Sequence, residues 1–108
     1  MNDSEKDGKV IGTVEVFGMR HNVAEVADTV WKSQWMGRAS TQDLAVYMNP
    51  DLKEDARDET LLHEVLHLVS SHMKLEIKEQ DVTVLSFGLY SAGCRVKMAK
   101  MPAVEERQ

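Results

Sequence analysis

The sequence predicts a small α+β domain, in which a short antiparallel or mixed sheet of about three strands packs on two helices. Three observations predict this class. β-branched residues alternate with other residues in the N-terminal half, which is typical of strands. The C-terminal half carries apolar residues at helical spacing. The chain has 108 residues, of which 43% are hydrophobic, a size that suits one modest core.

The N-terminal half is expected to supply the strands. Residues 9–18 form a valine-rich alternating run that ends at Gly18, and residues 22–27 form a weaker one. Residues 42–48 predict a third strand before the turn signal Asn-Pro-Asp. One face of this third strand would carry Leu44, Val46 and Met48, and the other face would carry Asp43, Ala45 and Tyr47.

Between the second and third predicted strands, residues 28–37 contain two tryptophans four positions apart, Trp31 and Trp35. This spacing fits one or two helical turns that end at Gly37. We expect both tryptophans to pack in the core, as large aromatic side chains usually do.

Two helices are predicted in the C-terminal half, over residues 53–72 and 78–92, with Gly93 closing the second. Residues 94–100 could extend this helix or form a short strand. The buried stripe of the second helix is expected to consist of Val82, Leu85 and Leu89.

Composition and charge exclude several classes of protein. The net charge is −5, which argues against a general nucleic-acid binder. No apolar run approaches the roughly 20 residues of a membrane span, and the polar N-terminus lacks a secretory signal. A single cysteine, Cys94, fits a reducing compartment. We therefore expect a cytoplasmic domain over residues 9–101, with a disordered N-terminal tail at residues 1–8 and a short polar C-terminal tail at residues 102–108.

The predicted helix over residues 53–72 contains the motif His-Glu-Val-Leu-His at residues 63–67. Because a helix turns about 100° per residue, His63 and His67 lie on one side of it and could hold one Zn²⁺. Glu64 is rotated away from the ion and is placed to take a proton from a zinc-bound water, as the general base.

A catalytic zinc ion usually needs a third protein ligand. Glu79 and Asp81, at the start of the second predicted helix, flank its buried stripe on opposite sides, so helical geometry alone leaves both open. Glu79 is preferred because it shares its side with Thr83 and Ser86 and has the longer reach. His72 points roughly opposite His63 on a continuous helix and is the weakest of the three candidates.

Residues 59–67, ETLLHEVLH, and residues 75–90, LEIKEQDVTVLSFGLY, resemble the small zincin-like metallopeptidases of phages and prophages. The resemblance covers residues 37–91 and includes a Gly-Arg turn at Gly37. It implies a minimal gluzincin-type fold, with zinc held by His63, His67 and a carboxylate near the start of the second helix, and with Glu64 as the base.

The expected function is therefore zinc-dependent hydrolysis of a peptide or protein substrate, in the host-cell cytosol if a phage encodes the chain. The edge of the predicted strand at 42–48 could hold an extended substrate. The donor that stabilises the oxyanion remains open among four residues, with Tyr90 preferred. The other three are Tyr47, His21 and Arg38.

Three alternatives remain. A non-catalytic interaction module of phage origin could use zinc to staple its two helices. A zinc-dependent ribonuclease with three motif histidines fits less well, because Glu64 replaces a glycine and the third spacing is one residue short. A phage protein could also bind a host partner without metal. The sequence leaves the oligomeric state undetermined.

Overall fold

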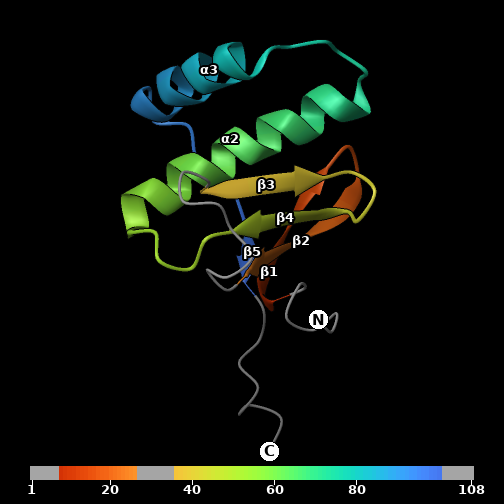
Figure 1. Cartoon of the computed structure of the whole chain (residues 1–108), viewed down its shortest axis with the longest axis vertical. Coiled ribbons are helices and arrows are strands. Elements are labelled where there is room, and N and C mark those ends of the chain that lie inside the picture. Colours follow the sequence, from red (N-terminus) through yellow and green to blue (C-terminus); the bar gives the residue numbers. More distant parts are fainter. Residues whose placement is uncertain (1–7, 27–35, 101–108) are drawn as a thin grey trace, which may run out of the picture.

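The computed structural model describes residues 8–26 and 36–100, and within them it forms one five-stranded mixed sheet and two helices (Figure 1). The α+β class is confirmed, whereas the expected number of about three strands was too low. The strands are β1 (Lys9–Val16), β2 (Met19–Glu25), β3 (Gly37–Ser40), β4 (Ala45–Met48) and β5 (Ala99–Lys100). The helices are α2 (Glu54–His72) and α3 (Glu79–Ser91).

The strands lie in the order β3-β4-β2-β1-β5. β1 and β2 form an antiparallel hairpin in which Val16 pairs with Met19. The two connecting residues, Phe17 and Gly18, both have positive φ, 54° and 75°, as a type I′ turn requires. The strand predicted over residues 9–18 therefore ends at Val16, two residues before its predicted end. β4 pairs in parallel with β2 and antiparallel with β3, which makes β3 an edge strand.

The third predicted strand was only partly correct. β4 begins at Ala45, because Leu44 adopts a left-handed φ of 52° and ends the turn between β3 and β4. Leu44 is exposed and does not share a face with Val46 and Met48, which are both buried. Gly37 does not end a helix but begins β3, a strand that the sequence pattern does not reveal.

The molecule has three layers, in which α2 lies between the sheet and α3 (Figure 1). Leu61 and Leu68 of α2 share the main hydrophobic core with residues from β1, β2 and β4. These strand residues are Val14, Val16, Val23, Val46 and Met48. The helix α3 packs on the opposite side of α2, so it contacts the rest of the fold along one side only.

Because α3 lies on the outside of the fold, its buried surface differs from the predicted stripe of Val82, Leu85 and Leu89. Val82 is 1% exposed, but Leu85 is 48% exposed and Leu89 is 37% exposed. Ser86, not a leucine, is the other buried residue of the helix. The reason is that a helix packed on a single neighbour buries a narrow strip of its surface, about one residue per turn.

Both predicted helices are confirmed to within one residue at each end. Gly93, with φ of 102°, follows α3, and residues 94–100 end in the short strand β5, which pairs with β1 at Gly12 and Thr13. The predictions for both tails, for residues 28–35 and for Trp31 and Trp35 fall on residues outside the described ranges, apart from Gly8.

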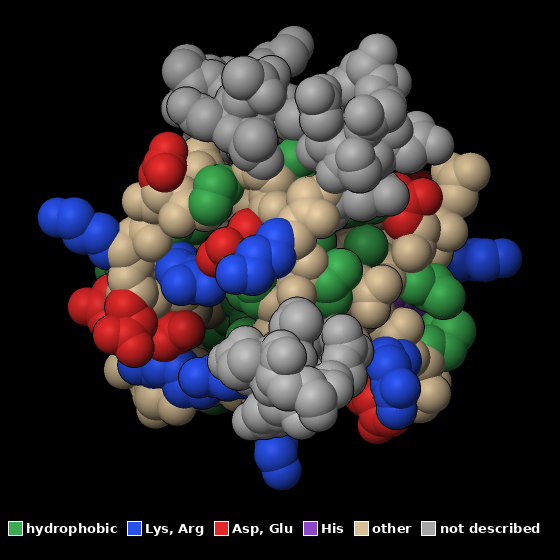
Figure 2. Space-filling model, turned by 90° about the horizontal axis from the view of Figure 1, so that it is seen from below, with side chains coloured by type: hydrophobic (Ala, Val, Ile, Leu, Met, Phe, Trp, Pro, Cys, Tyr) green, Lys and Arg blue, Asp and Glu red, His purple; other side chains and the backbone are tan. Residues whose placement is uncertain are grey.

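Two surface properties bear on the expected classes of partner. On the side facing away from α3, the described acidic and basic side chains are interspersed rather than gathered by sign (Figure 2). In the described part of the chain, neither helix is both long and apolar enough to cross a bilayer.

Candidate metal centre

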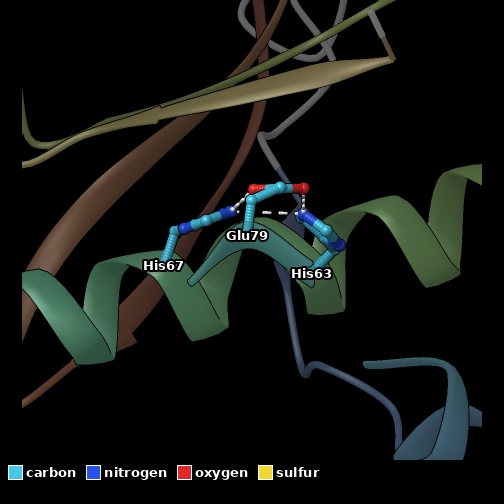
Figure 3. Close-up of side chains that lie close together, drawn as sticks. All are labelled: His63, His67 and Glu79. Carbon is cyan, nitrogen blue, oxygen red and sulfur yellow. Dashed lines mark hydrogen bonds and ion pairs between the residues drawn. The ribbon is translucent and has the colours of Figure 1, made fainter. Parts of the chain in front are cut away.

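Two imidazoles and one carboxylate meet between α2 and α3 (Figure 3). The Nε2 atom of His67 lies 2.7 Å from Oε1 of Glu79, and Nε2 of His63 lies 2.9 Å from Oε2 of the same carboxylate. The two Nε2 atoms are 3.2 Å apart. Three ligand atoms from two helices therefore converge on one point.

Local structure explains this convergence. One helical turn separates His63 from His67, so both rings project from the side of α2 that faces α3. Glu79 is the first residue of α3, and the preceding loop places this end of the helix over the two rings. The hydroxyl of Thr83, one turn further along α3, donates a hydrogen bond of 3.3 Å to Oε2 of Glu79.

The three atoms suit a zinc ion. Tetrahedral ligands about 2.0–2.2 Å from zinc lie roughly 3.3–3.5 Å from one another. The separations of 2.7, 2.9 and 3.2 Å are slightly shorter, so a small outward rotation of the side chains would admit the ion. A carboxylate oxygen and an imidazole lone pair repel at such distances unless a proton or a cation lies between them. The arrangement therefore demands positive charge at its centre.

The pKa of the Glu79 carboxyl group also shows that the site favours positive charge at its centre. Partial burial acts to raise this pKa, but the charges of His63 and His67 and their hydrogen bonds outweigh burial and hold the pKa below its ordinary value. The carboxyl group is thus ionised at neutral pH, as a zinc ligand must be.

Glu64 stands beside this group without joining it. Its side chain is 7% exposed, and burial, followed by the negative charge of Glu79, raises its pKa to about 7. A carboxyl group with such a pKa can both take up and release a proton near neutral pH, which is the property required of a general base and acid.

The three ligands and Glu64 line a cleft of about 1000 Å³. One wall is α2, the opposite wall consists of residues 36–42 with the edge strand β3, and Glu79 and Thr83 border it from α3. The predicted substrate edge at 42–48 was wrong, because β4 is paired on both sides. Among the described strands, β3 is the one at the edge of the sheet beside the motif helix.

Gly37 sets the closeness of β3 to the motif helix. A Cβ atom at this position would lie 2.8 Å from Cγ2 of Thr60 and 3.2 Å from Cγ of Glu64. The absence of a side chain therefore allows the strand to run directly over α2 beside Glu64. Sequence reasoning assigned Gly37 to a turn and missed this role, because close backbone approach leaves no local signal.

The other predicted third ligands lie elsewhere. Asp81 does not belong to the ligand group formed by the described residues. His72 instead pairs with His21, with 3.1 Å between their Nε2 atoms, and His21 is fully buried and also contacts the backbone oxygen of Met19 at 2.9 Å. This second histidine pair connects the β1–β2 hairpin to the end of α2.

Of the four predicted oxyanion donors, Arg38 is the one that lines the cleft. Tyr90 stacks under the guanidinium of Arg95, which lies 3.7 Å from the ring centroid, and Tyr47 donates a hydrogen bond of 2.9 Å to Asp43. His21 is occupied by His72. The structure therefore does not bring Tyr90, the preferred candidate, to the cleft.

Sequence reasoning also missed the group behind His63. The Nδ1 atom of this ring lies 3.3 Å from Oγ of Ser86, and this hydroxyl donates to Oε2 of Glu59 at 3.0 Å. The polar strip of Glu79, Thr83 and Ser86 on α3 pointed to Ser86, but Glu59 lies on the other helix and gave no such signal.

Comparison with known proteins adds no relative to this description. No family model, no curated protein and no solved structure matches the chain. The resemblance to small zincin-like metallopeptidases therefore rests on the motif residues themselves, and the geometry of the site carries the functional argument.

Proposed function

We propose that this chain is a zinc-dependent peptidase of the zincin-like type, acting on a peptide or protein substrate. The observation that carries the proposal is the convergence of His63, His67 and Glu79 beside the buried carboxyl group of Glu64, in a cleft bordered by a free strand edge. Each part has a separate role in peptide hydrolysis.

The metal ligands and the base Glu64 would have different roles in the reaction. Zinc bound by the two imidazoles and Glu79 would supply a Lewis acid that polarises a carbonyl group and acidifies water. Glu64 would take the proton of the attacking water and deliver it to the leaving amine. In the metal-free site the pKa of Glu64 is about 7, so the group can both hold and release a proton near neutral pH.

The edge strand β3 would position the substrate. Its outer edge is not paired within the described sheet, and residues 36–42 border the cleft. An extended peptide could pair with this edge through backbone hydrogen bonds. Arg38, which lines the cleft, is the candidate donor for the oxyanion.

A second function is favoured by the placement of the ligands on two helices. Because α3 buries little apolar surface, zinc could act as a staple that holds α3 on α2 in a non-catalytic interaction module of phage origin. In such a module the protein would bind zinc but would not cleave peptides.

Glu64→Gln separates the two functions. The substitution should leave zinc binding within about twofold and abolish cleavage, because Gln cannot accept the proton. Zinc content is measured by mass spectrometry on protein purified without a histidine tag, and cleavage on a proteome-derived peptide mixture. Zinc binding without cleavage by the unsubstituted protein would support the staple, and equal cleavage by both proteins would disprove the role of Glu64.

A further inference from the structure

We propose that Ser86 and Glu59 act as positioning residues that fix the tautomer and orientation of His63, so that its Nε2 lone pair points at the metal position. This inference rests on the proposed metal site, which it extends from the ligands to the groups behind them. It follows from the number of hydrogen-bond donors and acceptors around the hydroxyl group of Ser86.

The hydroxyl of Ser86 has three partners and one proton. Two partners, the carboxylate of Glu59 and the backbone oxygen of Thr83, each lie 3.0 Å from Oγ and can only accept. The single proton of Ser86 is therefore directed to these acceptors. The third partner, Nδ1 of His63 at 3.3 Å, must then donate, which places a hydrogen on Nδ1 and makes Nε2 the nitrogen that a metal can bind.

Burial makes this arrangement rigid. Ser86 is 0% exposed and is one of the two buried residues of α3. Because water does not reach the Ser86 hydroxyl, rotating it away from both acceptors would leave its own proton without a partner. In metal sites, such partners of a histidine ligand orient the ring and raise its basicity.

The hydrogen-bonded chain of Glu59, Ser86 and His63, which we call the relay, also joins the two helices at a second point. Glu59 and His63 lie on α2, whereas Ser86 lies on α3, so the hydroxyl is held by both helices. Ser86 contacts Nδ1 of the His63 ring and Glu79 contacts Nε2. Both contacts therefore form only when α3 packs on α2. His63 is correctly oriented only when α3 is in place.

Two substitutions test the relay, with one matched control. Ser86→Ala removes the acceptor for Nδ1 and should weaken zinc binding by about 10–100-fold. Glu59→Gln should weaken it by a smaller factor, because the carbonyl of Thr83 still takes the serine proton. The control, Ser70→Ala, removes a buried hydroxyl that donates to the backbone oxygen of Leu75 at 3.1 Å and should change zinc affinity by less than about twofold.

The zinc affinity of the full chain is measured by competition with a chromophoric chelator, and the tautomer by long-range proton–nitrogen NMR of the imidazole. The tautomer is also measured in metal-free protein at alkaline pH. We expect a larger fraction of the Nδ1-protonated tautomer of His63 in the unsubstituted protein and in Ser70→Ala than in Ser86→Ala.

The same fraction of the Nδ1-protonated tautomer and the same zinc affinity in Ser86→Ala as in Ser70→Ala would overturn the relay. Failure of the unsubstituted protein to bind zinc would instead refute the proposed function, while the tautomer in metal-free protein would still decide the relay. If Ser86→Ala does not fold, Glu59→Gln carries the test: unchanged affinity would count against the relay.

Discussion

Glu64 is held in a buried position that favours its neutral form, and this has a measurable effect on stability. The pKa of about 7 in the folded protein lies above the ordinary value of 4.5. Between these two values the folded state binds more protons than the unfolded state, so the free energy of unfolding falls as the pH rises. The contribution of Glu64 is fully favourable below about pH 4.5 and is lost by about pH 7.

Metal-free Glu64→Gln should therefore be more stable than the unsubstituted protein at pH 8 and similar to it at pH 4. The difference at pH 8 should approach 3 kcal/mol, since each pKa unit corresponds to about 1.4 kcal/mol. Urea unfolding at the two pH values measures it. Glu79, whose pKa is lowered, contributes with the opposite sign, and its repulsion with ionised Glu64 is part of the difference measured at pH 8. A constant difference between pH 4 and pH 8 would contradict the assignment.

The choice of third ligand is also tested at single residues. Glu79→Gln should weaken zinc binding by at least tenfold, because the amide carries no charge and binds zinc poorly. Asp81→Asn is the matched control, two positions further along α3, and should leave zinc affinity within about twofold. Isothermal titration with Zn²⁺ measures both, and a greater loss in Asp81→Asn would reverse the assignment.

At the scale of elements, the approach of β3 to α2 depends on Gly37. Gly37→Ala should displace β3 from the motif helix, since the added Cβ would lie 2.8 Å from a side-chain atom of Thr60. We expect lower stability and lower peptide cleavage. Gly88→Ala is the control: no atom lies within 4 Å of its added Cβ, and Ala favours a helix over Gly by about 1 kcal/mol.

Thermal unfolding and cleavage of a peptide substrate are the measurements for this pair of substitutions. Gly88→Ala should raise the melting temperature and leave cleavage unchanged. Equal cleavage by Gly37→Ala and the unsubstituted protein would show that the separation of β3 from α2 does not matter to the reaction.

The elements differ in how far the sequence predicts them, and the difference has a physical cause. α2 and α3 were predicted to within one residue, because apolar spacing and terminal residues are local signals. β3 was missed because Gly-Arg-Ala-Ser has no strand pattern, and its conformation comes from pairing with β4. Leu44 was misplaced because its left-handed φ depends on the turn that joins these two strands.

The site shows the same division between local and tertiary information. His63, Glu64 and His67 follow from spacing within one helix. Glu79 and Asp81 could not be separated by helical geometry, because the direction from which α3 approaches α2 decides between them. Glu59 and Ser86 meet across 27 positions, and only the packed structure shows their contact.

At the scale of the whole molecule, zinc should stabilise the fold through the contact of α3 with α2. Free zinc at 100 times its dissociation constant would add about 2.7 kcal/mol, which corresponds to roughly 10–20 °C in melting temperature for a domain of this size. Thermal unfolding with Zn²⁺ and with a chelator measures the shift. Glu79→Gln is the control and should show little response, whereas an equal response would indicate zinc binding elsewhere.

Because α3 lies on the outside of the molecule, loss of the metal would affect this helix first. The loop before this helix is exposed and contains Lys74 and Lys78, so a protease that reaches it would separate the helix from the remainder of the chain. In a cell, the lifetime of the protein would then follow the supply of zinc: scarcity would shorten it, and abundance would protect it. Under the proposed function, the ion needed to cleave a substrate would also protect the protein itself from cleavage.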